Sequence, residues 1–146
     1  MNINPAGVEI PTEITFVAHA EPVGEGPWFG PDDPYGLECV VPIVGPSSYL
    51  MWVKLARLVT ASADPVRFVA VELFRSIGLG VGTHRNSAGV RTLSRMAAFG
   101  LLYPTRNPAL LAVPVALAPL PSSALSRLTS PGQRYHHQRT LRPVRS

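Results

Sequence analysis

The chain has 146 residues, of which 46% are hydrophobic, so it is long and apolar enough for one domain with a core and is not disordered throughout. Its single cysteine excludes an intrachain disulfide and fits a reducing cytoplasm. Residues 1–53 contain seven acids and no Lys or Arg, whereas residues 54–146 contain all thirteen basic residues and only two acids. This division of charge, −7 against +11, favours a polyanion, usually nucleic acid, as partner of the basic part over a basic surface without a dedicated partner.

Residues 1–46 are rich in Pro and Gly and carry most of the acids, which predicts an extended arm packed on the domain. Short strands are expected at residues 14–18 and 37–44, with a loop at 24–36 between them. The aromatic residues of that loop attach the arm to the core or form a protein-binding patch: Trp28, Phe29 and Tyr35.

Three helices are expected next. Apolar residues at helical spacing predict the first over residues 46–62, with a cap at Ser47 or Ser48. Asp64 as N-cap and Pro65 at the first helical position predict a second helix, which ends at Gly78. The third begins at Asn86 or Ser87 and ends at Gly100.

The third helix carries the strongest functional signal. Arg91 and Arg95 lie opposite an apolar face, and no acidic residue stands near them in the sequence. Like charges at this spacing repel by about 0.2–0.5 kcal/mol, so an anionic partner explains both better than solubility alone. Gly89, in the first turn, costs about 1 kcal/mol relative to Ala, which suggests that another part of the chain approaches the backbone there.

After Gly100 the sequence predicts two strands around a turn that contains Arg106, with Pro114 placing the second strand at an edge or a bulge. A short helix capped by Ser122 or Ser123 follows, and residues 130–146 form a basic, mobile tail. The predicted organisation is therefore an arm at 1–46, a folded domain at 47–128 and a tail at 129–146.

The order helix, helix, turn, helix, hairpin over residues 48–121 resembles the winged helix-turn-helix family. More narrowly, the stretch GLGVGTHRNSAGVRTLSRMAAFGLL is similar to small actinobacterial and actinophage proteins. The resemblance implies a mostly α fold with a small β wing (α+β), whose third helix enters the major groove of DNA. It places these residues at the DNA: Ser87, Ala88, Arg91, Thr92 and Arg95, with Arg106 at the wing tip. Arg85 and Asn86 add donors at the N-terminus of the same helix, where backbone N–H groups favour a phosphate.

Other motifs are weaker. GLGVG at 78–82 follows a predicted helix and precedes no G-K-[ST], which argues against a nucleotide loop. YHHQR at 135–139 and a Cys39–His19 pair lack the further residues that a metal site or a nucleophilic enzyme needs. Four prolines interrupt the uncharged residues 107–126, so no membrane helix is expected, and no signal peptide is visible.

We therefore expect a cytoplasmic, non-enzymatic protein that binds double-stranded DNA without cofactor or metal, with transcriptional regulation as its use. One alternative is a protein–protein module, from a phage or its host, that reuses the winged-helix shape and binds through the arm or wing. Another is RNA or ribosome binding through the Arg-rich tail. A homodimer formed through the first helix or the arm is left open.

Overall fold

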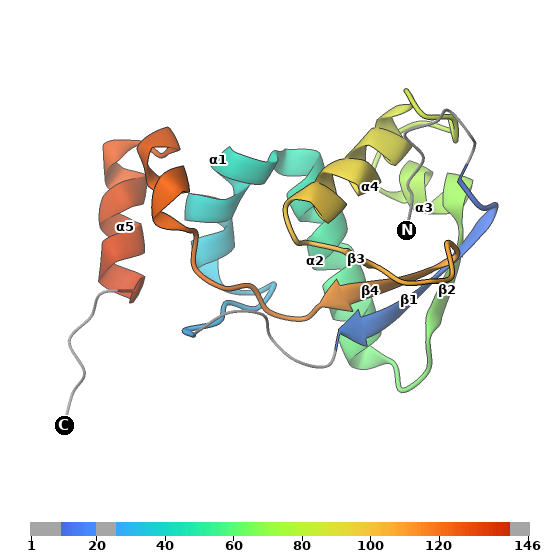
Figure 1. Cartoon of the computed structure of the whole chain (residues 1–146), viewed down its shortest axis with the longest axis horizontal. Coiled ribbons are helices and arrows are strands. Elements are labelled where there is room, and N and C mark those ends of the chain that lie inside the picture. The colour runs from blue at the N-terminus through green and yellow to red at the C-terminus, as the bar shows by residue number, and fades with distance from the viewer. Residues whose placement is uncertain (1–9, 20–25, 141–146) are drawn as a thin grey trace.

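A computed structural model describes residues 10–19 and 26–140 and shows a mixed α+β fold (Figure 1). In chain order its elements are β1 (Glu13–His19), a π-helical turn η1 (Gly36–Val40), α1 (Val41–Val44), α2 (Pro46–Ala61), β2 (Val66–Val69), α3 (Ala70–Ser76), α4 (Ala88–Ala98), β3 (Tyr103–Pro104), β4 (Leu110–Pro114), a 3₁₀ turn η2 (Ser122–Arg127) and α5 (Ser130–Thr140). The expected α+β class is confirmed at this level.

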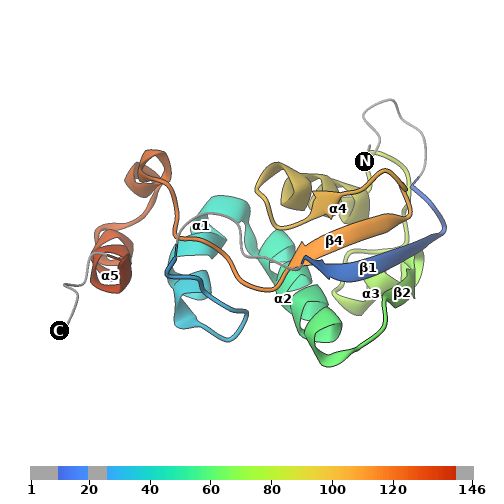
Figure 2. The ribbon, with the colours of Figure 1, turned by 60° about the horizontal axis from the view of Figure 1, so that its bottom comes forward.

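The four strands form one sheet in the order β2-β1-β4-β3. β1 pairs antiparallel with β2 and parallel with β4, and β4 pairs antiparallel with β3. Ile14 and Phe16 of β1 are fully buried, as the alternation of a half-buried strand requires. The strand expected at 14–18 is thus confirmed, and it lies inside the sheet, with a neighbouring strand on either side. Figure 2 shows β1 and β4 side by side at one end of the molecule and α5 at the other.

Helix α2 matches its predicted range, and its apolar side packs against β1, β4 and α4. The buried indole of Trp52 donates a hydrogen bond to the carbonyl of Pro114 at 2.8 Å, which fixes the helix to the end of β4. The prediction that Ser47 or Ser48 is the N-cap of this helix is wrong. That position belongs to Gly45, whose φ of 90° is one that glycine adopts readily, and no side chain caps the helix.

Helix α4 also matches its prediction, from the N-cap Ser87 to the stop at Gly100, which has a φ of 75°. The N–H of Leu101 donates to the carbonyl of Met96 at 2.8 Å, the bond that closes a helix before a left-handed glycine. The expected close approach at Gly89 is confirmed, because a Cβ there would lie 2.3 Å from ring atoms of Phe74 in α3.

Two segments differ from the predictions. Residues 37–44, expected as a strand, are helical in η1 and α1, where Cys39, Val40, Ile43 and Val44 share one buried side. A short apolar run fits a buried helix as well as a strand, so the pattern alone does not decide. The helix expected from Asp64 begins only at Ala70, because the preceding four residues form β2 and pair with β1. Sheet pairing outweighs the local start signal there.

The hairpin after Gly100 is confirmed as β3–β4, but β4 is not an edge strand. Pro114 is its last residue and lies opposite His19, where a missing N–H interrupts no further pairing. The connecting loop is held by the hydroxyl of Thr105, which donates to the carbonyl of Leu110 at 2.7 Å, and by the side chain of Asn107, which accepts from the N–H of Ala109. Arg106 is exposed in this loop.

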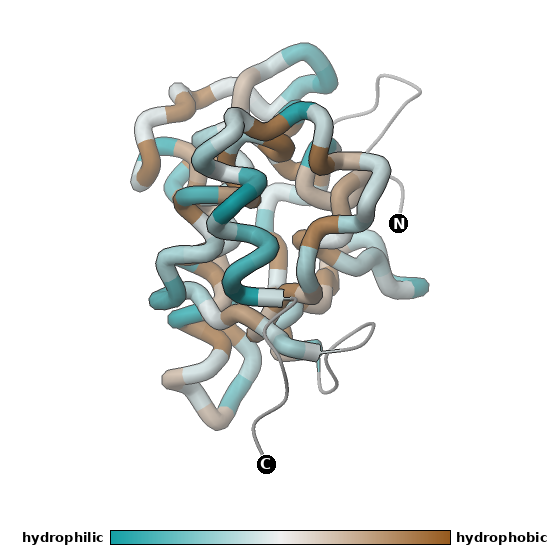
Figure 3. The backbone as a smooth tube through the Cα atoms, turned by 90° about the vertical axis from the view of Figure 1, so that its left-hand side faces the viewer, coloured by the Kyte–Doolittle hydropathy of each residue, from teal (hydrophilic) through white to brown (hydrophobic). Residues whose placement is uncertain are grey.

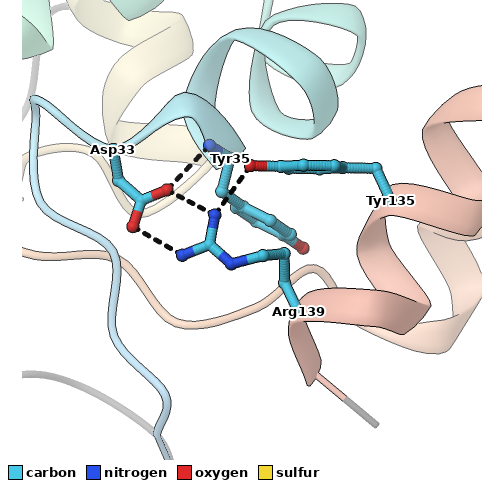
Figure 4. Close-up of polar contacts among 4 residues, drawn as sticks. All are labelled: Asp33, Tyr35, Tyr135 and Arg139. Carbon is cyan, nitrogen blue, oxygen red and sulfur yellow. Dashed lines mark hydrogen bonds and ion pairs between the residues drawn. The ribbon is translucent and has the colours of Figure 1, made fainter. Parts of the chain in front are cut away.

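Most of the segment expected to be a mobile tail forms α5, which packs on η1. Both terminal nitrogens of Arg139 donate to the carboxylate of Asp33 at 2.7 Å, and one also donates to the hydroxyl of Tyr135 at 2.8 Å (Figure 4). The Arg139 guanidinium lies 5.0 Å from the ring centroid of Phe29. Polar contacts rather than an apolar stripe hold this helix, and Figure 3 shows how hydrophilic it is.

A second contact lies beneath that ion pair. The buried hydroxyl of Tyr35 accepts a hydrogen bond from the N–H of Leu120 at 3.0 Å and is 2.8 Å from Nδ1 of the buried His136. The hydroxyl proton is therefore available to a neutral imidazole, and burial lowers the pKa of His136. The aromatic residues Phe29 and Tyr35 are core residues, which confirms the expectation that they attach this segment to the fold, whereas Trp28 is exposed.

Candidate nucleic-acid interface

The exposed face of α4 carries Arg91 and Arg95, with the small residues Ala88 and Ala98 beside them. The opposite face is buried and includes Val90, Leu93 and Met96, as the periodicity predicted. The two arginines therefore stand together on an outer helix face, between Ala88 and Ala98. Such a face leaves room for a large ligand to approach the guanidinium groups.

Thr92, which the resemblance places among the DNA contacts, lies next to Arg91 and Arg95 on α4 but is itself buried. It is only 6% exposed, and its hydroxyl donates to the carbonyl of Ala88 at 2.8 Å. The hydroxyl proton is used inside the helix, so Thr92 supports α4 and does not donate that proton to a ligand.

Arg95 also has a structural contact. Its Nε donates to the carbonyl of Val44 at 2.6 Å, and its guanidinium lies 5.3 Å from the ring centroid of Phe99. Carbonyls at a helix C-terminus carry partial negative charge, so this bond suits the end of α1 and ties it to α4. The Nε atom is occupied, while the terminal nitrogens provide the remaining donors.

A hollow of about 320 Å³ lies where α4 meets the start of α2. Arg91, Arg95 and Ala88 line it from α4, and Ser47 and Ser48 line it from α2. Val44 and Leu79 are its largest apolar lining residues, and no acidic residue lines it. The structure thus brings the two arginines together with the N-terminus of a helix that begins some forty residues earlier.

Thr92 also lines this hollow, whereas the remaining predicted residues do not. Arg85 and Asn86 are exposed in the loop before α4, and the hydroxyl of Ser87 donates to the carbonyl of His84 at 2.6 Å. Arg106 is exposed between β3 and β4. They therefore belong to the loop before α4 and to the hairpin after it, on either side of the helix in sequence.

Ion pairs account for part of the division of charge in the sequence. Within residues 10–19 and 26–140 three pairs form, and each joins an acid of the first 53 residues to a base that follows them: Asp32 with Arg57, Glu13 with Arg67, and Asp33 with Arg139. Neither Arg91 nor Arg95 has a carboxylate partner in the described part of the chain. The acid-free surrounding seen in the sequence at these two residues therefore persists in the fold.

Sequence reasoning missed the residues that α2 contributes to the hollow. Gly45 and Pro46 turn the chain so that Ser47 and Ser48 fall in the first helical turn, which contains no acidic residue. The lack of a carboxylate at this helix start was visible in the sequence as a signal for an anion, whereas the lack of a capping side chain was not, because Ser47 or Ser48 was expected to cap the helix. Nothing in the sequence, however, indicated that this helix start faces Arg91 and Arg95.

Other kinds of site receive little support from the described residues. No group of three His, Cys, Asp or Glu side chains gathers there in a way that could hold a metal ion. The thiol of Cys39 is fully buried 3.7 Å from the carbonyl of Gly132, and burial raises its pKa to about 11, which opposes nucleophilic chemistry. Of the adjacent histidines, His136 is buried against Tyr35 and His137 is exposed.

A second, larger hollow of about 450 Å³ lies between α1, the end of α4 and the segment after β4. Its lining is mainly apolar and includes Ile43, Phe99 and Leu120, with Arg127 as its one charged lining residue. It lacks the convergent donors of an anion site. No helix in the described residues has the length and apolar character needed to cross a membrane.

The geometry on α4 is thus the part of the molecule best suited to an anionic partner. Comparisons with protein-family models, with curated proteins and with solved structures find no match to this chain.

Proposed function

We propose that this protein binds double-stranded DNA through α4, as a winged helix-turn-helix domain that regulates transcription. The observation that carries the proposal is the exposed pair Arg91 and Arg95, which has no carboxylate partner among the described residues. Arginine donates two parallel bonds to guanine O6 and N7 or to a phosphate, so two arginines without carboxylate partners on one helix face suit either contact.

The order of elements supports the winged-helix assignment. Helices α2 and α3, a loop, helix α4 and the hairpin β3–β4 follow one another in the expected sequence. Three features are additional to that order, namely β2 between α2 and α3 in the chain, β1 between β2 and β4 in the sheet, and the long connection from Gly78 to Ser87. All three lie outside α4 and leave its outer face exposed.

Each candidate residue except the buried Thr92 has a role at the DNA in this proposal. Arg91 contacts a base edge or a phosphate from the centre of the exposed face, and Arg95 contributes its terminal nitrogens beside it. Arg85, Asn86 and Ser87 lie at the N-terminal end of α4, where backbone N–H groups and the helix dipole favour a phosphate. Arg106 reaches the flanking backbone from the hairpin.

The proposal is tested by titrating labelled duplex DNA with the full chain at several salt concentrations between roughly 50 and 200 mM. Sequence-independent phosphate contacts make an arbitrary duplex a valid probe, and affinity should fall steeply with salt. The variant Arg91→Ala/Arg95→Ala should reduce the salt slope by about one per lost phosphate contact. If either residue reads a base in the natural site, its loss costs about 1–3 kcal/mol there.

The matched control is Arg127→Ala/Arg134→Ala, which removes the same charge from the exposed surface of η2 and α5, at the other end of the molecule (Figure 1). This control should bind almost as the unchanged protein does. If it loses binding while the α4 variant keeps it, the contact lies on α5, as the RNA alternative expects. If the unchanged protein binds no duplex at low salt, the proposal is refuted and a protein partner becomes the better explanation.

A further inference from the structure

The start of α2 presents backbone donors that no acceptor in the described part of the chain satisfies. The N–H of Gly45 donates to the carbonyl of Val41, and the first intrahelical bond runs from Tyr49 N–H to the carbonyl of Gly45 at 3.1 Å. Between them, Pro46 has no N–H, and the N–H groups of Ser47 and Ser48 have no such partner. Two adjacent donors therefore remain at the positive end of a 16-residue helix.

A buried hydroxyl at the same place is also without a partner. Ser48 is only 2% exposed and lines the hollow between α2 and α4, yet its side chain makes no hydrogen bond with any residue in the described ranges. Buried polar groups are nearly always hydrogen-bonded, so an unpaired one in the lining of a hollow indicates a missing ligand. This observation is independent of the helix N-terminus, because it concerns the side chain.

Positive charge completes the arrangement. The guanidinium groups of Arg91 and Arg95 line the hollow from α4, and the Nε of Arg95 would lie 3.6 Å from a Cβ at Gly45, so this arginine lies directly over the turn into α2. No carboxylate lines the hollow. An anion placed there meets N–H, O–H and guanidinium donors from two helices, which is the donor set that a tetrahedral oxyanion requires.

We propose that this hollow binds one phosphate group, held by the N–H groups of Ser47 and Ser48, the Ser48 hydroxyl, and the guanidinium groups of Arg91 and Arg95. The phosphate is either a backbone phosphate of DNA lying across α4 or a free phosphate. Its assignment to DNA rests on the proposed function, whereas the site itself does not. In the first case the hollow fixes the position of α4 on the duplex without reading its sequence.

The test begins with the ¹⁵N-labelled full chain, titrated with inorganic phosphate and, separately, with sodium chloride at matched ionic strength. Phosphate should shift the amide resonances of Ser47 and Ser48 saturably, and chloride should not. Ser48→Ala and Arg91→Gln should each weaken this binding by about tenfold, the effect of one hydrogen bond to a charged group. The matched control Arg134→Gln, which removes an exposed arginine of α5 outside the hollow, should leave binding unchanged.

Equal shifts with chloride, or equal weakening by Arg134→Gln, would overturn the site, and the same spectra report whether each variant is folded. A second titration uses duplex DNA. Shifts of the same two amides, lost in Ser48→Ala, assign the phosphate to DNA. If phosphate binds and no duplex does, the DNA-binding proposal fails and the site stands as one for free phosphate. If the duplex binds but these amides respond to neither titrant, the site is refuted and DNA binding stands.

Discussion

Gly89→Ala gives a sharp test of the packing between α3 and α4. In a helix, Ala is more favourable than Gly by about 1 kcal/mol, so sequence alone predicts a more stable protein. The structure predicts the opposite, because the new Cβ would lie 2.3–2.6 Å from three ring atoms of Phe74, which is fully buried and has no space to yield. Overpacking costs about 1–3 kcal/mol, and three such contacts place this case near the upper value. The net loss in the free energy of unfolding is therefore roughly 2 kcal/mol.

The measurement is urea denaturation followed by far-ultraviolet circular dichroism, with the slope against urea compared between proteins. Gly132→Ala is the matched control, since Gly132 also lies in the first turn of a helix but its Cβ would meet nothing closer than 3.4 Å. This control should be as stable as the unchanged protein or slightly more stable. If Gly89→Ala is also at least as stable, the reasoning about the contact between α3 and α4 is wrong.

The contacts that hold α5 and the buried thiol give further predictions. Arg139→Ala removes a two-bond ion pair with Asp33 and should lower the free energy of unfolding by about 1–3 kcal/mol in urea denaturation; an unchanged value would show that the pair is not stabilising. Because the hydrogen bonds from Arg139 hold the pKa of Asp33 below its usual 3.8, the carboxylate stabilises the fold above about pH 4, and this contribution is lost as the pH falls through the lowered pKa. Acid titration should therefore show a smaller loss in Arg139→Ala. The thiol of Cys39, buried and with its pKa raised to about 11, should react with iodoacetamide only as the protein opens, and rapid alkylation of the folded protein would contradict that placement.

Elements with a strong local signal could be predicted from the sequence. β1, α2 and α4 each combine a clear hydrophobic period with residues that mark their ends, and all three occur where expected. Local signals failed where a distant partner decides the conformation. Residues 66–69 suit a helix by their own pattern, but pairing with β1 makes them a strand. The polar sequence of α5 has no apolar stripe that would predict where it packs. The ion pair that holds it, between Arg139 and Asp33, joins residues 106 positions apart.

Some features of the candidate site could likewise be predicted from the sequence, and others depend on contacts between distant parts of the chain. The absence of acids around Arg91 and Arg95 could be read directly from the sequence, and it persists in three dimensions. The burial of Thr92 follows from the direction in which α4 packs, which a helical period locates only to within about one residue. The contribution of Ser48 depends on the turn at Gly45, which brings the start of α2 to α4, and no spacing within one helix reveals it.

The placement of β1 has a consequence for the order in which the protein folds during synthesis. Its antiparallel partner β2 leaves the ribosome about fifty residues later, but its parallel partner β4 follows only after some forty more. Until then the second edge of β1, with Ile14 and Phe16 beside it, has no strand to pair with. An uncovered apolar edge invites pairing with other nascent chains, so the interval before Leu110–Pro114 emerges is when this protein is most exposed to aggregation and to capture by chaperones.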